Sequence, residues 1–180
     1  NLINQAWTGG LNNPQISNID LNNDGILDLF LFDRSGNVKL VFLVENNNGE
    51  INYVPDTGLP ETFPEFKDWV LLADYNQDGK ADIFTHSSEI AGGGIAVYKN
   101  TSVGSTISFE LMSGLLQAHA EFESGGIDFP LFVNAADIPS FLDVDEDGDM
   151  DILTFAVSGA ELEYYENQSQ ELFGDNEHLI

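Results

Sequence analysis

The chain has 180 residues, of which 31 are Asp or Glu and only 5 are Lys or Arg, so its formal net charge at pH 7 is −26. Its hydrophobic residues, 42% of the total, are enough to fill the core of one domain, which excludes a disordered acidic tail. A surface this negative repels phosphate backbones and anionic lipid headgroups. We therefore expect no nucleic-acid partner and cations as the counter-species. No apolar run is long enough to span a bilayer, so we also expect no membrane span.

A nine-residue pattern occurs three times, at residues 20–28, 74–82 and 143–151. Each copy has Asp at positions 1, 5 and 9, Asp or Asn at position 3, and Gly at position 6. Short apolar, aromatic and β-branched runs without a helical period stand before and after each copy. The pattern therefore indicates a tight loop between two strands.

Further strand-like runs follow each loop at a similar distance. A third run ends at Asn46, Asn100 or Asn167, and we align these three residues with one another. A fourth run follows in the first two copies, at residues 51–59 and 107–115, whereas the third copy has no clear fourth strand. Gly- and Asn-rich joints between the runs are typical of turns between antiparallel neighbours.

Four-stranded units that recur at intervals of roughly 50 to 70 residues are typical of β-propeller blades. We therefore expect an all-β fold, with residues 1–180 forming one β-propeller segment of three four-stranded antiparallel repeats. A closed propeller needs about four to eight blades, so remaining blades or another chain should cover the open sheet ends. The predicted ranges are 14–59 for the first blade repeat, 66–115 for the second, 116–136 for an inter-blade loop insertion and 137–180 for the third.

The loop chemistry predicts a calcium site in each copy. Side-chain oxygens at positions 1, 3, 5 and 9 are hard donors that converge on one point, and calcium takes six to eight oxygens. Zinc prefers nitrogen and sulfur, and magnesium keeps its water. The helical EF-hand and dockerin loops need an acidic residue at position 12, where this chain has Leu31, Thr85 and Thr154.

The chain resembles the FG-GAP/VCBS-type repeats of integrin-alpha-like calcium-binding β-propellers, in which such a loop joins the first two strands of a blade. No literal Phe-Gly or Gly-Ala-Pro segment precedes the loops, which favours the bacterial VCBS type. Matching by position, the resemblance implies three sets of metal ligands, with position 7 supplying its main-chain carbonyl: Asp20, Asn22, Asp24, Ile26 and Asp28; Asp74, Asn76, Asp78, Lys80 and Asp82; Asp143, Asp145, Asp147, Asp149 and Asp151.

The third loop has four side-chain carboxylates among these implied ligands, where the other two loops have three carboxylates and an Asn. Because the number of charged ligands is one determinant of calcium affinity, we predict that the third loop binds calcium most tightly.

The resemblance also bears on function and location. The style of the sequence around residues 21–30 is similar to that of Bacteroidetes secreted and cell-surface proteins. We expect a non-catalytic, calcium-stabilised module at the bacterial cell surface or outside the cell, which binds a protein or glycan ligand in adhesion. The alternative is the propeller part of a secreted polysaccharide-degrading enzyme, a lyase or a hydrolase. Five scattered Lys and Arg residues and no recognisable catalytic constellation favour the first hypothesis.

Other residues that could carry chemistry have simpler interpretations. The three histidines are predicted to be ordinary surface or core residues. Asn100 and Asn167 match the glycosylation sequon, but each also belongs to the repeating strand end. Five aromatic residues could form a sugar-stacking platform, although core packing is the favoured role. They are Trp7, Trp69, Tyr75, Phe129 and Phe132.

Overall fold

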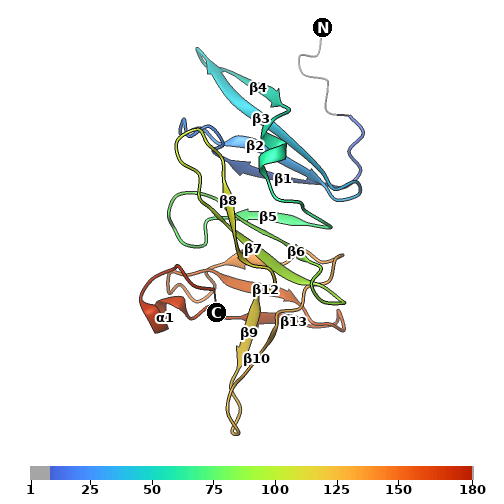
Figure 1. The fold of residues 1–180 in the computed structure, drawn as a ribbon, viewed down its shortest axis with the longest axis vertical. Helices are drawn as coiled ribbons and strands as arrows, with labels where there is room; N and C mark the ends of the chain where they lie inside the picture. The colour runs from blue at the N-terminus through green and yellow to red at the C-terminus, as the bar shows by residue number, and fades with distance from the viewer. Residues whose placement is uncertain (1–8, 180) are drawn as a thin grey trace.

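The computed structural model describes residues 9–179 and consists of antiparallel sheets stacked along one long axis (Figure 1). The first sheet holds β1 (Pro14–Ile19), β2 (Asp28–Asp33), β3 (Val38–Asn47) and β4 (Glu50–Asp56). The second sheet holds β5 (Val70–Ala73), β6 (Asp82–Ser87), β7 (Gly94–Asn100) and β8 (Phe109–Ser113). The third sheet holds β11 (Ser140–Leu142), β12 (Asp151–Phe155) and β13 (Leu162–Tyr165).

Within each sheet, strands that follow one another in sequence are antiparallel neighbours, which confirms the predicted all-β class and antiparallel pairing. The first two sheets have four strands, as expected, and lie within residues 14–59 and 66–115. A 3-10 turn, η1 (Leu59–Thr62), follows the first sheet. Among the described residues, no helix is long and apolar enough to cross a membrane.

The third sheet has three strands within the described residues instead of the four expected for each repeat, and this copy is the one whose sequence shows no clear fourth strand. After β13 the chain forms the short helix α1 (Ser169–Phe173), which ends at Gly174 with a left-handed φ of 72°. The segment that becomes α1 lacks the apolar alternation of the fourth strands in the other repeats, so a helical turn replaces an edge strand here.

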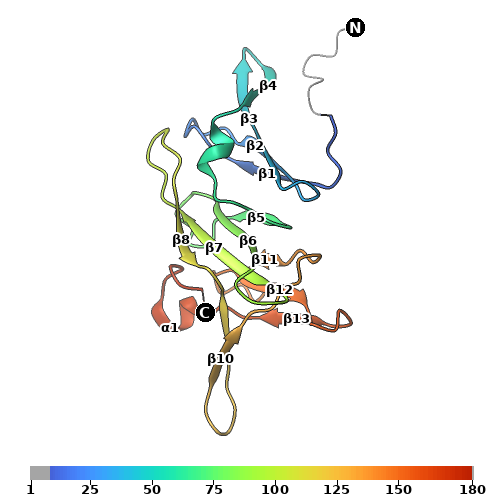
Figure 2. The same cartoon turned by 45° about the vertical axis from the view of Figure 1, so that its right-hand side comes forward.

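The insertion at residues 116–136 was expected to be a loop but contains a β-hairpin. Its strands are β9 (Gln117–Ala120) and β10 (Ile127–Pro130), which extend past the third sheet at one end of the stack (Figure 2). The Leu131 N–H donates to the Leu116 carbonyl at 2.9 Å and continues the pairing. Leu116 and Ala118 are buried, whereas Gln117 and His119 are exposed. This alternation of buried and exposed residues explains why the segment forms a strand.

Two apolar cores hold the stack together. The first core lies between the first and second sheets, where Phe30 stacks on Phe63 with ring centroids 4.8 Å apart. The second core lies between the second sheet, the hairpin and the third sheet, where the ring centroids of Phe84 and Phe141 are 3.9 Å apart. Each pair of adjacent sheets therefore has its own core, since strand faces must be covered to be stable.

The strand register corrects one alignment made from sequence. In each sheet the second residue of the second strand has one partner on the third strand. These partners are Phe42 for β2, Tyr98 for β6 and Tyr165 for β12. Two residues further on stand Val44, Asn100 and Asn167, so Asn46 is not the equivalent of the other two asparagines. The reason is that the β6–β7 turn is longer than the β2–β3 turn. The Asn46 side chain instead accepts a hydrogen bond from the Gly49 N–H at 2.9 Å in the next turn.

The exposed fraction of the residue at position 2 shows whether another sheet packs on that loop. Leu21 and Tyr75 are each 1% exposed because the next sheet packs on them, whereas Val144 in the third loop is 42% exposed. On the same side of the third sheet, Phe155 and Leu162 are also exposed and pair with each other across the strands. The outer face of the third sheet is thus apolar and uncovered in this chain.

We predict that Leu21→Ala lowers the free energy of unfolding by about 2–5 kcal/mol, because it leaves a cavity in the first core. Val144→Ala, at the same loop position, should change it by less than about 0.5 kcal/mol, as is usual for a surface site. Urea unfolding of both variants at low protein concentration measures the difference. Equal losses would mean that the outer face of the third sheet is covered in solution.

Candidate metal sites in the three loops

The backbone of the three loops follows one conformation. Position 4 is a non-glycine residue with φ between 57° and 66°, and position 6 is a glycine with φ between 82° and 106°. A positive φ is costly for L side chains, so its recurrence at position 4 marks strain held by the surrounding structure. Glycine at position 6 relieves the same strain. The residues are Asn23, Gln77 and Glu146 at position 4, and Gly25, Gly79 and Gly148 at position 6.

Main-chain N–H groups orient the side chains of the first loop. Asp20 accepts hydrogen bonds from the N–H groups of Asp24 and Gly25, at 3.2 and 2.9 Å. Asn22 Oδ1 also accepts from the Asp24 N–H, and Asp24 accepts from the Ile26 N–H at 2.8 Å. The oxygens at positions 1, 3 and 5 are thereby directed toward the loop interior.

The second loop repeats this network with the equivalent residues. Asp74 accepts from the N–H groups of Asp78 and Gly79, and Asp78 accepts from the Lys80 N–H at 2.9 Å. Asn76 Oδ1 accepts from the Asp78 N–H at 3.2 Å. Two loops of different sequence thus present the same arrangement of oxygen atoms.

The third loop makes equivalent main-chain contacts at Asp143, Asp145 and Asp147, and its carboxylates also form two close groups. One oxygen from each of Asp143, Asp145 and Asp151 lies within 4.8 Å of the others. Asp147, expected at the same site, belongs instead to a second group with Asp149 and Glu171, again within 4.8 Å. Glu171 lies in α1, outside the nine-residue pattern, so no spacing in the sequence pointed to it.

The aspartate at position 9 has a structural role that the sequence pattern does not reveal. Its carboxylate is fully buried in all three loops. One oxygen accepts from the N–H of position 2 at 2.8–3.2 Å, and the other from an N–H of the third strand of the sheet or the residues just after it, at 2.7–2.9 Å. We call this double contact the position-9 clamp. It joins Asp28 to Leu21 and Val44, Asp82 to Tyr75 and Asn100, and Asp151 to Val144 and Asn167.

The electrostatics of the loops favour a bound cation. Burial raises the pKa of Asp82 to about 6, the charges of Asp78 and Asp74 add to this, and the two clamp N–H groups oppose it. Burial likewise raises the pKa of Asp28, against the main-chain N–H groups of Val44 and Leu21. These raised pKa values mean that burial disfavours the ionised form of Asp28 and Asp82, a cost that a nearby divalent cation would offset. The donors are all oxygen atoms, which fits calcium and not zinc.

The second and third loops also contact each other. The Gln77 side-chain amide, at position 4 of the second loop, donates to the Gly148 carbonyl, at position 6 of the third loop. Position 4 of the second loop therefore lies beside position 6 of the third loop.

The aromatic residues considered for sugar stacking do not gather into a platform within the described part of the chain. Trp69 and Tyr75 are buried in the second core, Phe129 packs against it, and Phe132 is half-buried. Trp7 lies outside the described residues.

The two sequon residues are explained by the repeat. Asn100 and Asn167 are 4% and 6% exposed, and both donate a main-chain N–H to a position-9 clamp. Burial and the clamp therefore agree with the repeating strand end as the reason for these asparagines.

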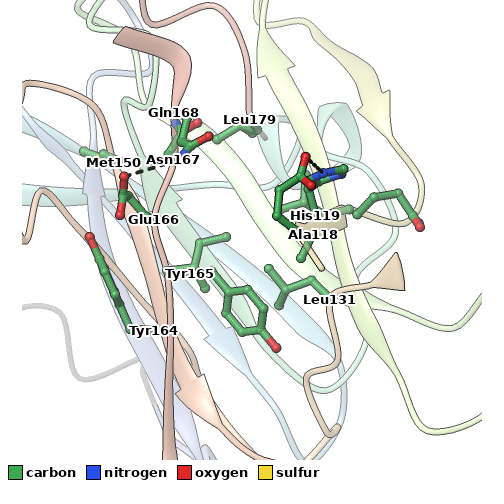
Figure 3. A pocket seen from close by; sticks show the side chains of 14 residues that line it. Ala118, His119, Leu131, Met150, Tyr164, Tyr165, Glu166, Asn167, Gln168 and Leu179 are labelled. Carbon is green, nitrogen blue, oxygen red and sulfur yellow. Dashed lines mark hydrogen bonds and ion pairs between the residues drawn. The ribbon is translucent and has the colours of Figure 1, made fainter. Parts of the chain in front are cut away.

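A pocket of about 300 Å³ lies between the hairpin and the third sheet (Figure 3). His119 and Leu131 line it from the hairpin side, and Tyr165, Glu166 and Asn167 line it from the end of β13. No sequence pattern pointed to this pocket, because the insertion that forms one of its walls was expected to be a loop.

Comparison with known proteins bears on the first two loops. Residues 20–85 match the model of the FG-GAP-like repeat family. This range begins at the first aspartate of the first loop and ends within β6, so it includes both loops and the strands between them. No curated protein and no solved structure matches the chain. The chain therefore carries an FG-GAP-type repeat, in agreement with the resemblance noted from the sequence.

The position-9 clamp predicts a defect that does not depend on metal. Asp82→Ala leaves two buried N–H groups without an acceptor, at about 1–3 kcal/mol each, so it should destabilise the protein by at least about 2 kcal/mol. A loss of this size should persist in excess EDTA, where a metal-ligand role of Asp82 contributes nothing. Asp78→Ala, at the exposed position 5, should cost less than about 1 kcal/mol in EDTA. Urea unfolding in both buffers compares the two variants, and a loss for Asp82→Ala seen only in calcium would contradict the clamp.

The pKa values of two histidines, His119 and His86, provide a second, independent test of the structure. Hydrogen bonds with Asp128 and Glu121 raise the pKa of His119, whereas burial lowers the pKa of His86 despite Asp68 3.0 Å away. A raised folded pKa means that the His119 ion pairs stabilise the hairpin fully below the unfolded value of about 6.5, and lose this effect as the pH rises through the folded pKa.

An NMR pH titration should therefore give His119 a pKa above about 6.5 and His86 a pKa below it. Asp128→Asn should lower the pKa of His119 and leave that of His86 unchanged. Equal values for the two histidines in the wild-type protein would contradict the contacts that His119 makes across the hairpin.

Proposed function

We propose that this chain is part of a calcium-stabilised β-propeller module that works outside the cell, at the bacterial surface, as a non-catalytic binding or adhesion domain. The observation that carries the proposal is the repetition of one loop conformation, with the same strained position 4, the same glycine and the same clamp, between the first two strands of each sheet.

In this proposal calcium has a structural role. The position-9 clamp ties each loop to its sheet, and calcium would neutralise the carboxylates at positions 1, 3 and 5, which otherwise repel one another. Loops of moderate affinity would be filled at the millimolar calcium of extracellular fluids. The net charge of −26 is compatible with such a calcium-rich setting.

The pocket between the hairpin and the third sheet is the best candidate for ligand contact. Tyr165 supplies an aromatic ring, and Glu166, Asn167 and Gln168 supply polar groups, while no Lys or Arg of the described chain lines the pocket. A neutral glycan or a polar peptide segment fits this lining better than an acidic polysaccharide does, since its one basic side chain, His119, is already paired with Asp128 and Glu121. This lining also favours the binding role over the lyase alternative.

Calcium should raise the melting temperature of the purified chain. Occupancy at one hundred times Kd contributes about 2.7 kcal/mol per site, or about 5–10 °C for a chain of this size. A thermal melt with and without calcium measures the shift, and isothermal titration calorimetry ranks the loops. Asp74→Ala should remove the site of the second loop, and the third loop should retain the highest affinity. No calcium-dependent shift would refute the proposed role of the loops.

The binding role is tested by a glycan and peptide array in calcium, with the same array in EDTA as the control. A parallel screen of acidic and neutral polysaccharides for product release tests the enzymatic alternative. Calcium-dependent turnover in that screen would replace binding by catalysis as the function.

A further inference from the structure

The third loop has an acidic group that the FG-GAP-type ligand pattern does not include. One oxygen from each of Asp147, Asp149 and Glu171 lies within 4.8 Å of the others. Only Asp147 belongs to the side-chain ligands implied by the repeat, because position 7 is expected to contribute its main-chain carbonyl. Asp149 adds a side-chain carboxylate there, and Glu171 comes from α1.

Burial of unpaired oxygens distinguishes this group from an ordinary acidic surface. Asp149 is 1% exposed, and its Oδ1 atom is buried and has no hydrogen-bond partner among the described residues. Asp147 Oδ2 is likewise buried without a donor. A buried carboxylate oxygen without a donor is costly, and a cation beside two of them would offset that cost.

The remaining oxygens of these residues are already used to position the group. Asp149 Oδ2 accepts from the Gln170 N–H at 3.0 Å, and Asp147 Oδ1 accepts from the Asp149 N–H at 3.0 Å. The buried Ser169 hydroxyl donates to the Asp175 carbonyl at 2.7 Å and holds the short helix in place. These contacts hold the loop and α1 in positions where one carboxylate oxygen from each of Asp147, Asp149 and Glu171 lies within 4.8 Å of the others.

The other two loops provide an internal comparison. Their position 7 residues are Ile26 and Lys80, neither of which carries a carboxylate, and both are followed by sheets with a fourth strand instead of a helix. The additional acidic group is therefore restricted to the third loop, where α1 takes the place of the fourth strand.

We propose that Asp147, Asp149 and Glu171 form an additional divalent-cation site, selective for calcium, beside the site of the third loop. Asp147 would bridge the two sites, with Asp149 Oδ1 and the Glu171 carboxylate completing the new one. Oxygen donors alone and a carboxylate from a separate element suit a hard cation that accepts irregular geometry. The cation would fasten α1 to the third loop. This inference rests on the proposed function for the presence of calcium around the protein. The choice of the three carboxylates as ligands does not depend on the proposed function.

The test is the number of calcium ions bound by the whole chain, measured by equilibrium dialysis at neutral pH with calcium as the only ligand. The wild-type chain should bind four ions, and Glu171→Gln should bind three. Asp149→Asn should also bind three, because it keeps the main-chain carbonyl that the repeat uses. Glu161→Gln, an exposed residue of the β12–β13 turn with the same change of charge, should still bind four.

Circular dichroism and the melting temperature in EDTA establish that each variant is folded before the ions are counted. Three ions for both the wild-type chain and Glu171→Gln would overturn the additional site and leave the proposed function intact. No bound ion in the wild-type chain would overturn both. Loss of an ion in Glu161→Gln as well would also overturn the additional site, since charge alone would then explain the effect.

Discussion

A buried aspartate that accepts two main-chain hydrogen bonds is the interaction on which each repeat depends. Position 9 stands at the first residue of the second strand, and its two oxygens are used by the loop on one side and by the third strand on the other. An asparagine could accept only one of these bonds, and an alanine neither. The loop, the first hairpin and the register of the third strand are therefore set by one side chain.

The remaining features are arranged around these clamps. Because the loop is held at both ends, its polar oxygens face inward, and the apolar residue at position 2 is pressed against the next sheet in the first two repeats. Arg34, the only arginine, donates to the carbonyls of Asp68, Ala135 and Ala136, and so ties the first repeat to the segments that precede the other two sheets. One of the few basic side chains of this protein therefore stabilises the packing of its segments instead of contacting a ligand.

Much of this architecture could be read from sequence, because loops and strands leave local patterns. The spacing of aspartates and glycines located all three loops, and the apolar runs located the strands of the first two sheets. Features that depend on distant contacts could not be read in the same way. Asn46 was aligned with Asn100 because a change in turn length is invisible without the pairing, and Glu171 lies on a helix that no periodic signal connects to the loop.

The clamp also makes the fold of a repeat independent of the side chains proposed to bind metal. Its aspartate is held by main-chain N–H groups, so substitutions at positions 1, 3 and 5 would abolish the proposed cation binding while the hairpin and its register persist. Repeats within one chain could then drift independently, some keeping a cation and others keeping only the turn. Under such drift position 9 would be the last acidic residue to change, and it would outlast the ligands that make the pattern recognisable.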